Sequence, residues 1–208
     1  MTSLLTSISK VSEERKGVRP RYEAAHVVLT LNTILDEQPI GRMSIMRKTG
    51  LTEAAVKTML RRMKEEALIN VDKVGGVTLT ETGTKVIKAW RGRFEVTEVK
   101  LKTIGWETVA LRVKEGVRLL QGVKVLRLRD DVIREGADEV LIAYFTETWK
   151  VELPPSTPSE VNPLLQELKS HCPNCEGDVV LFIRPNTRII AYRTSVMLLG
   201  IIGDRIPC

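Results

Sequence analysis

The sequence predicts an α+β protein with two domains: a mainly helical N-terminal domain, followed by a C-terminal α+β domain with a mixed sheet. Three features of the 208-residue chain support this division. Residues 21–92 show helical spacing of apolar residues around one short hairpin, residues 93–208 alternate strands with helices, and the excess positive charge lies in the first half. Residues 1–20 precede both domains as an N-terminal arm or a weak first helix.

Helix and turn signals follow one another closely in the N-terminal domain. Apolar residues at helical spacing predict a strongly apolar helix, which Pro39 ends. Gly50 stops a short helix, and Thr52 is a suitable N-cap for the next one. Gly75 and Gly76 supply the backbone freedom that a tight hairpin needs. The predicted order is therefore helices over 22–37, 42–48 and 52–66, strands over 69–73 and 77–79, and a closing helix over 80–90.

The helix predicted over 52–66 is amphipathic, because Val56, Leu60 and Met63 share one face and basic residues lie on the others. A helix, a tight turn, a second helix and a hairpin follow the order of a winged helix-turn-helix, in which the second helix enters the major groove of DNA. The hairpin, or wing, would then lie on the DNA backbone. We expect double-stranded DNA to contact Arg42, Thr52, Glu53, Lys57, Thr58, Arg61, Arg62 and Lys73.

Two stretches carry a family resemblance. The segments TGLTEAAVKTMLRRMKEEALI and VTLTETG resemble the winged-helix transcription regulators of bacteria and archaea over about residues 20–92. The resemblance implies a DNA-binding regulator. Ala67 replaces the usual glycine before the wing, so the turn there is expected to differ slightly. The alternative is a protein-interaction module in a larger complex without sequence-specific DNA binding, since some winged helices bind RNA or protein.

The charge distribution favours a polyanionic partner for the N-terminal half. Residues 1–97 contain 17 Lys and Arg against 11 Asp and Glu, whereas residues 98–208 contain 15 of each. DNA would therefore be attracted to the first half only. The longest strongly apolar run, Val196 to Ile202, is too short to span a membrane, and no secretory signal is evident. We expect a cytoplasmic protein that does not associate with membranes.

The C-terminal domain shows strands interleaved with helices. We expect a single mixed sheet with helices on one side. The segment RDDVIREGAD, together with the order of the two domains, resembles an uncharacterised archaeal family of winged-helix proteins whose second domain has no assigned function. The predicted strands cover 107–113, 139–146, 149–153 and 178–183, the helices cover 124–135, 161–170 and 187–202, and residues 93–101 form a linker or an entering strand.

The sharpest chemical signal is a Cys-x-x-Cys pair, Cys172 and Cys175, which is half of a structural zinc site. Cys208 is a candidate third ligand, but no second pair exists. The alternative, which we favour, is a loop with two thiols or a local disulfide, and we expect no metal and no cofactor. The sequence shows no glycine-rich phosphate loop, no paired metal-binding histidines and no nucleophile elbow, so we expect no enzyme.

The second domain is expected to dimerise, to sense a small-molecule effector, or both. The expectation of a homodimer rests on the apolar last helix, 187–202, and on the limited specificity of one short recognition helix. Two copies read two half-sites and multiply that specificity.

Overall fold

The structure of the protein is a computed structural model, and it describes residues 4–15, 17–72, 75–146, 150–154 and 162–203. The chain divides into two compact units. The N-terminal unit runs to Arg91 and includes the end of the last helix from Val196, and the C-terminal unit runs from Gly92 to Ser195. Helices and sheets occur together, as the predicted α+β class requires. Within the described ranges, no helix combines the length and apolarity needed to cross a membrane.

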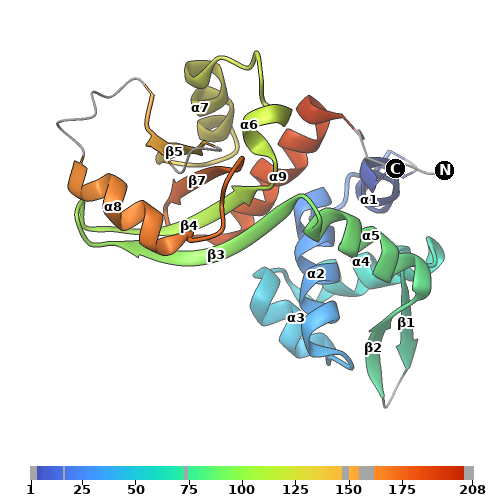
Figure 1. The fold of residues 1–208 in the computed structure, drawn as a ribbon. Coiled ribbons are helices and arrows are strands. Elements are labelled where there is room, and N and C mark those ends of the chain that lie inside the picture. Colours follow the sequence, from blue (N-terminus) through green and yellow to red (C-terminus); the bar gives the residue numbers. More distant parts are fainter. Residues whose placement is uncertain (1–3, 16, 73–74, 147–149, 155–161, 204–208) are drawn as a thin grey trace. The chain divides into compact units, whose positions relative to one another are not determined.

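The N-terminal unit is a small helical domain with a two-stranded antiparallel hairpin (Figure 1). The predicted helix, turn, helix and hairpin order is confirmed. The elements are α1 (Leu4–Ser12), α2 (Ala24–Glu37), α3 (Arg42–Thr49), α4 (Glu53–Glu65), β1 (Ile69–Asp72), β2 (Gly76–Leu79) and α5 (Glu81–Arg91).

The core of this unit forms around α2, whose apolar residues are buried along most of its length. The segment before it is more ordered than a free arm. Leu4, Ile8 and Val11 on α1 are buried, and α1 packs on α2, α4 and α5. Its three apolar positions lie at helical spacing, which explains why a short serine-rich stretch can form a packed helix.

Local signals set the path of the chain between these helices. Gly50 ends α3 with φ of 69°, a left-handed conformation that glycine adopts without strain. The Thr52 side chain caps α4 by accepting a hydrogen bond from the backbone N–H of Ala55 at 3.4 Å. Gly83 on α5 lies against the backbone of Leu68, where an added Cβ would meet the carbonyl oxygen at 1.9 Å. Only glycine permits α5 to approach the start of the hairpin so closely.

The C-terminal unit contains a five-stranded sheet in the order β3-β4-β7-β5-β6. The strands predicted over 139–146 and 149–153 pair as an antiparallel hairpin, although Trp149, at the start of the expected second strand, lies outside the described residues. The elements are β3 (Phe94–Leu101), β4 (Trp106–Val113), α6 (Gly116–Leu119), α7 (Val125–Arg134), β5 (Glu139–Phe145), β6 (Val151–Glu152), α8 (Asn162–His171), β7 (Val179–Arg184) and α9 (Arg188–Ile202).

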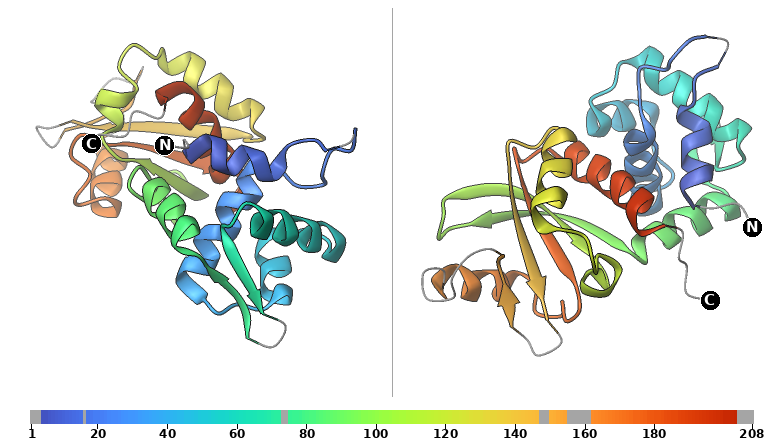
Figure 2. Two further views of the ribbon diagram at one scale, coloured as in Figure 1. Left: turned by 90° about the vertical axis from the view of Figure 1, so that its right-hand side faces the viewer. Right: turned by 90° about the horizontal axis from the view of Figure 1, so that it is seen from above.

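Two features of this sheet differ from expectation. Every strand pair is antiparallel, so the sheet is not mixed. Helices also cover both faces, with α8 on one and α6, α7 and α9 on the other (Figure 2). The central strand β7 explains the second difference. Its residues from Val179 to Ile183 are all buried, and a strand that is apolar on both sides needs a cover on both faces.

Candidate nucleic-acid interface

The exposed face of α4 carries three basic residues, Lys57, Arg61 and Lys64. They are spaced by four and then three residues, so successive turns present them along one side of the helix. The opposite side anchors α4, because Val56, Met59 and Met63 are fully buried. Burial of the apolar side thus fixes which way the basic side faces.

An open groove of about 750 Å³ runs between this basic face and the hairpin. Gly41, Arg42 and Met43 at the start of α3 form one end, and Val71 and Asp72 of β1 contribute the hairpin side. Met43 is 64% exposed and Val71 is 40% exposed, so the groove is lined by exposed apolar side chains as well as by positive charge. Lys57, Arg61 and Lys64 all line it.

An ion pair lies at the start of α4, and Arg61 farther along lies 3.8 Å from the Glu65 carboxylate. Arg42 lies 3.7 Å from the Glu53 carboxylate, and both side chains are substantially exposed. The Thr58 hydroxyl donates to the backbone carbonyl of Ala54 at 2.9 Å, while Thr52 serves as the helix cap. Five of the predicted contact residues, Arg42, Thr52, Glu53, Lys57 and Thr58, therefore cluster at the beginning of α4 and beside it.

Arg62 does not belong to this face, contrary to the sequence prediction. It is 6% exposed, and its Nη1 donates to the backbone carbonyls of Glu13 at 2.6 Å and Val11 at 3.3 Å. The guanidinium thus binds the C-terminal end of α1, where the last carbonyls of a helix lack internal partners. The sequence-based prediction placed Arg62 on the exposed face because it treated residues 1–20 as an arm or a weak first helix, and a packed α1 was not expected.

Lys64 was absent from the predicted contacts, although it lines the groove. Its position seven residues after Lys57, about two helical turns, was the signal that placed both on one face. Lys73, predicted near the tip of the wing, lies outside the described residues.

The turn from α4 into the hairpin uses Ala67 where a glycine was expected. Ala67 has φ of 53°, so it adopts the left-handed conformation that glycine would adopt. Its carbonyl accepts a hydrogen bond from the Thr80 hydroxyl at 2.6 Å, which ties the turn to the entrance of α5. The turn therefore holds a residue with a Cβ in a conformation that favours glycine.

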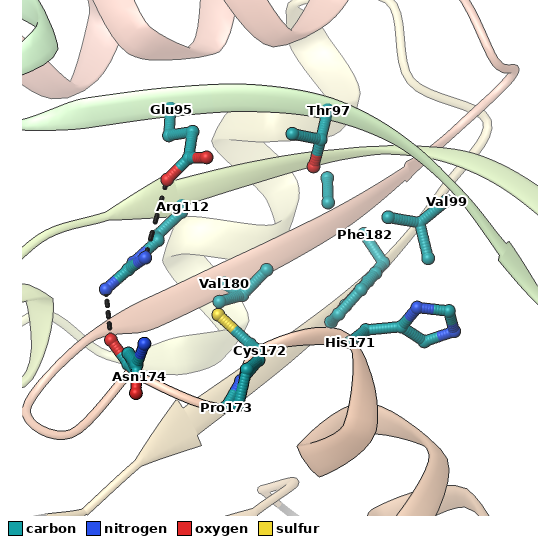
Figure 3. Close-up of a pocket in the computed structure, with 11 residues that line it drawn as sticks. Glu95, Thr97, Val99, Arg112, His171, Cys172, Pro173, Asn174, Val180 and Phe182 are labelled. Atoms are coloured by element: carbon teal, nitrogen blue, oxygen red, sulfur yellow. Dashed lines mark hydrogen bonds and ion pairs between the residues drawn. The ribbon is translucent and has the colours of Figure 1, made fainter.

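A second candidate site lies in the C-terminal unit, on the face of the sheet that α8 covers. This pocket of about 220 Å³ has a buried apolar floor of Ala110, Val180 and Phe182. Arg112 spans its polar wall (Figure 3). Its Nε donates to Asp178 at 2.6 Å and its Nη1 to Glu95 at 3.4 Å. An apolar floor with a fixed polar wall is the usual composition of a small-molecule site.

The Asn174 carbonyl also accepts from Arg112, so the loop after α8 is held against the sheet. Within this loop Cys172 and Cys175 are joined as a disulfide, which was one of the two alternatives to a zinc site. Cys208 lies outside the described residues. Among the residues that are described, no three His, Cys, Asp or Glu side chains come together as a metal site would require.

Comparisons with known proteins agree with this two-part architecture. Residues 21–92 match the model of the CggR N-terminal DNA binding domain. The first domain therefore has the element order of a winged helix and is similar to a DNA-binding domain family. Residues 104–201 match a domain of unknown function, DUF4443. The two matches together agree with the predicted arrangement, in which a winged-helix regulator carries a second domain of unassigned function.

A solved structure extends the similarity to the whole fold. A hypothetical protein from Pyrococcus horikoshii OT3 has a TM-score of 0.65 and 21% sequence identity, covering 90% of this chain and 96% of that one. At this identity the likeness concerns the fold alone. A comparison with curated proteins gives no match.

Proposed function

We propose that the protein is a transcriptional regulator that reads double-stranded DNA with α4 in the major groove and the β1–β2 wing along the backbone. The observation that carries this proposal is the row of Lys57, Arg61 and Lys64 on the exposed face of α4, beside a groove that the wing borders. The family match of the winged-helix domain supports the same partner.

The shape and charge of the groove suit one strand of a DNA backbone. When a helix lies in the major groove and a hairpin follows the backbone, a phosphate strand passes between them. Lys57, Arg61 and Lys64 would neutralise its phosphates or bond guanine edges. Thr52, Glu53 and Thr58, at the N-terminal end of α4, would face the bases, with Arg42 beside them.

The proposal is tested by measuring the affinity for duplex DNA over a range of salt concentrations. Replacing Lys57, Arg61 and Lys64 together with Ala should lower the affinity at low salt. It should also reduce the slope of log K against log salt by roughly 0.9 for each phosphate that the variant no longer neutralises. A selection from random duplexes would then identify the site that is read.

A matched triple variant separates local contacts from net charge. Lys100, Lys102 and Arg118 are exposed and belong to the C-terminal unit, so their replacement with Ala removes the same charge from the other unit. This variant should keep the wild-type slope. Equal slopes for all three proteins would remove α4 from the DNA model. An absence of DNA binding in the wild type would favour the protein-interaction alternative.

For the C-terminal unit we propose homodimerisation and the sensing of a small effector in the pocket beside Arg112. The effector would set an apolar part on Ala110, Val180 and Phe182 and direct a polar end to the Arg112 wall. Thr97 is an exposed residue of the pocket lining, so Thr97→Trp should fill the space with little effect on the core. A metabolite that raises the unfolding temperature of the wild type should not raise that of this variant. An equal rise in both proteins would place the ligand elsewhere.

A further inference from the structure

The pocket beside Arg112 has a charged end and an apolar end. Glu95 on β3 and Arg112 on β4 are direct cross-strand partners, and both line the pocket (Figure 3). The next pair on the same face is Thr97 with Ala110, and Ala110 is paired in turn with Phe182 on β7. Side chains two residues apart on a strand share a face and lie roughly 7 Å apart. The charged row and the apolar row are therefore within reach of one small ligand.

The charged end carries one cation and one anion, and both can bind a further group. The Arg112 guanidinium has five N–H groups, and its three hydrogen bonds described above use three of them. The buried Asp178 carboxylate fixes its orientation by accepting from Nε at 2.6 Å. The contact of Arg112 with Glu95 is 3.4 Å, longer than the roughly 2.7–2.9 Å of a strong charged pair. The Glu95 side chain is also 49% exposed, so its carboxylate is open to a ligand beside the pair.

The volume of the pocket limits the size of the ligand. A cavity of about 150 Å³ holds a benzene molecule. The pocket of about 220 Å³ should by proportion hold roughly nine non-hydrogen atoms. Ala110 provides this space, because a larger side chain between Thr97 and Phe182 would fill it. Leucine, isoleucine and methionine have the corresponding size.

We propose that the effector is a free α-amino acid with an apolar side chain of about the size of leucine. The proposal rests on the effector pocket proposed above and names the class of its ligand. The ligand carboxylate would accept from the remaining N–H groups of Arg112, and the ligand ammonium would donate to Glu95. The apolar side chain would extend along the strands onto Ala110 and Phe182, one residue pair away.

Charge complementarity favours this zwitterion over ligands with a single charge. An α-amino acid carries its two charges on neighbouring groups, as the Glu95 and Arg112 pair does. A simple carboxylate would bring an anion beside Glu95, and a simple amine would bring a cation beside Arg112. Each of these ligands would thus meet one attractive and one repulsive charge, which is a common source of specificity.

Titration calorimetry of the full chain provides the test, with L-leucine, L-isoleucine and L-methionine as the first ligands. The tightest is then compared with its two fragments. For leucine these are isoamylamine, which lacks the carboxylate, and isocaproate, which lacks the ammonium. Each fragment loses one charge-assisted hydrogen bond, so each should bind at least about tenfold more weakly than the amino acid.

Glu95→Gln sharpens the test, because its effect should depend on the ligand. It should weaken the binding of the amino acid at least about tenfold, since the ammonium loses its carboxylate partner. It should not weaken isocaproate, because that ligand has no ammonium and no longer meets an anion. Glu98→Gln is the matched control, since Glu98 is exposed on the same strand but projects to the opposite face. Arg112 is kept, because it also holds the loop after α8.

The outcomes separate the ligand class from the pocket itself. Equal affinity for the amino acid and one of its fragments, or an equal effect of Glu95→Gln on the amino acid and isocaproate, would overturn the zwitterion. If none of the three amino acids binds, the inference also fails. A different metabolite whose binding Thr97→Trp abolishes would then still support the effector pocket. Binding of the amino acid that Thr97→Trp leaves unchanged would overturn both.

Discussion

Arg61 and Arg62 are neighbours on α4 with opposite surroundings. Arg61 lines the groove, whereas Arg62 is buried and donates to the carbonyls of Val11 and Glu13. Arg62→Ala removes a buried hydrogen bond to Val11 and a partly buried one to Glu13, so we expect a loss of about 1–3 kcal/mol in the free energy of unfolding, although the Tyr22 hydroxyl still donates to the Val11 carbonyl. Urea unfolding followed by circular dichroism measures it.

Arg61→Ala is the matched control. Its side chain is exposed, so the variant should change stability by less than about 0.5 kcal/mol. It should instead weaken DNA binding. Equal unfolding midpoints for the two variants would show that Arg62 does not anchor α1.

Ala67 offers a stabilising substitution. Its φ of 53° costs a residue with a Cβ roughly 1–2 kcal/mol, and glycine avoids that cost while losing more chain entropy on folding. Ala67→Gly should therefore raise the free energy of unfolding by up to about 1 kcal/mol, measured by the same urea titration. A lower value would mean that the left-handed turn is not strained.

Glu167 on α8 holds the turn between β3 and β4 in place through hydrogen bonds. Its carboxylate accepts from the backbone N–H groups of Lys102 at 2.5 Å and Thr103 at 2.9 Å. Partial burial raises the pKa of Glu167, but these hydrogen bonds and that of the Thr103 side chain outweigh it, so the pKa is lowered overall. The carboxylate form is thus the one that the fold prefers.

A lowered pKa gives stability that is present above the ordinary pKa of glutamate and is lost as the pH falls through the lowered value. Glu167→Gln should therefore cost about 1 kcal/mol of unfolding free energy at pH 7. The difference from the wild type should shrink as the pH falls below about 4. Urea unfolding at a series of pH values tests this, with the exposed Glu107→Gln as control. A difference that is constant with pH would exclude the carboxylate as its source.

The helices and strands could be predicted from local sequence signals. The pairing of strands far apart in the sequence could not. Thr52 and Gly50 marked the ends of helices because caps depend on a few adjacent residues. The antiparallel order of the sheet depends on contacts between strands far apart in sequence, such as Val109 with Ile183. The continuous apolar run of β7 was visible in the sequence, and it did indicate a strand buried on both faces. Such a strand needs helices on both faces of the sheet, whereas we expected helices on one side only.

The site was predictable to the extent that it lies on one helix. Helical spacing put Lys57 and Arg61 on the outer side of α4 and could have added Lys64. The inward turn of Arg62 depends on α1, which lies far away in sequence. The groove between α4 and the hairpin needs both elements in place, so periodicity alone could not show it.

At the scale of the whole molecule, the two compact units should unfold in separate steps. One close-packed glycine in each unit provides the test. A Cβ on Gly83 would meet the Leu68 carbonyl at 1.9 Å, and one on Gly116 would meet the Val179 backbone at 2.8 Å. Each substitution with Ala should cost about 1–3 kcal/mol or more, because packed backbone cannot move aside easily.

Differential scanning calorimetry should then show two transitions. Gly83→Ala should lower the temperature of one and Gly116→Ala that of the other. Gly200, on α9, has open space around its Cβ position, so Gly200→Ala should lower neither. A single transition that all variants share would mean that the units unfold as one.

The central position of β7 has a consequence for synthesis. Chains grow from the N-terminus at roughly 5–20 residues per second, and domains generally fold as they emerge. The segment that matches a DNA-binding domain ends at residue 92, but β7, which joins β4 to β5, begins only at Val179. For much of translation the nascent chain would hold the segment that we propose reads DNA, together with two unjoined hairpins and without the end of α9. If the proposed DNA-reading segment folds without the end of α9, a polypeptide released before Val179 would occupy DNA sites without the domain that we expect to pair or sense, and would compete with the full-length protein.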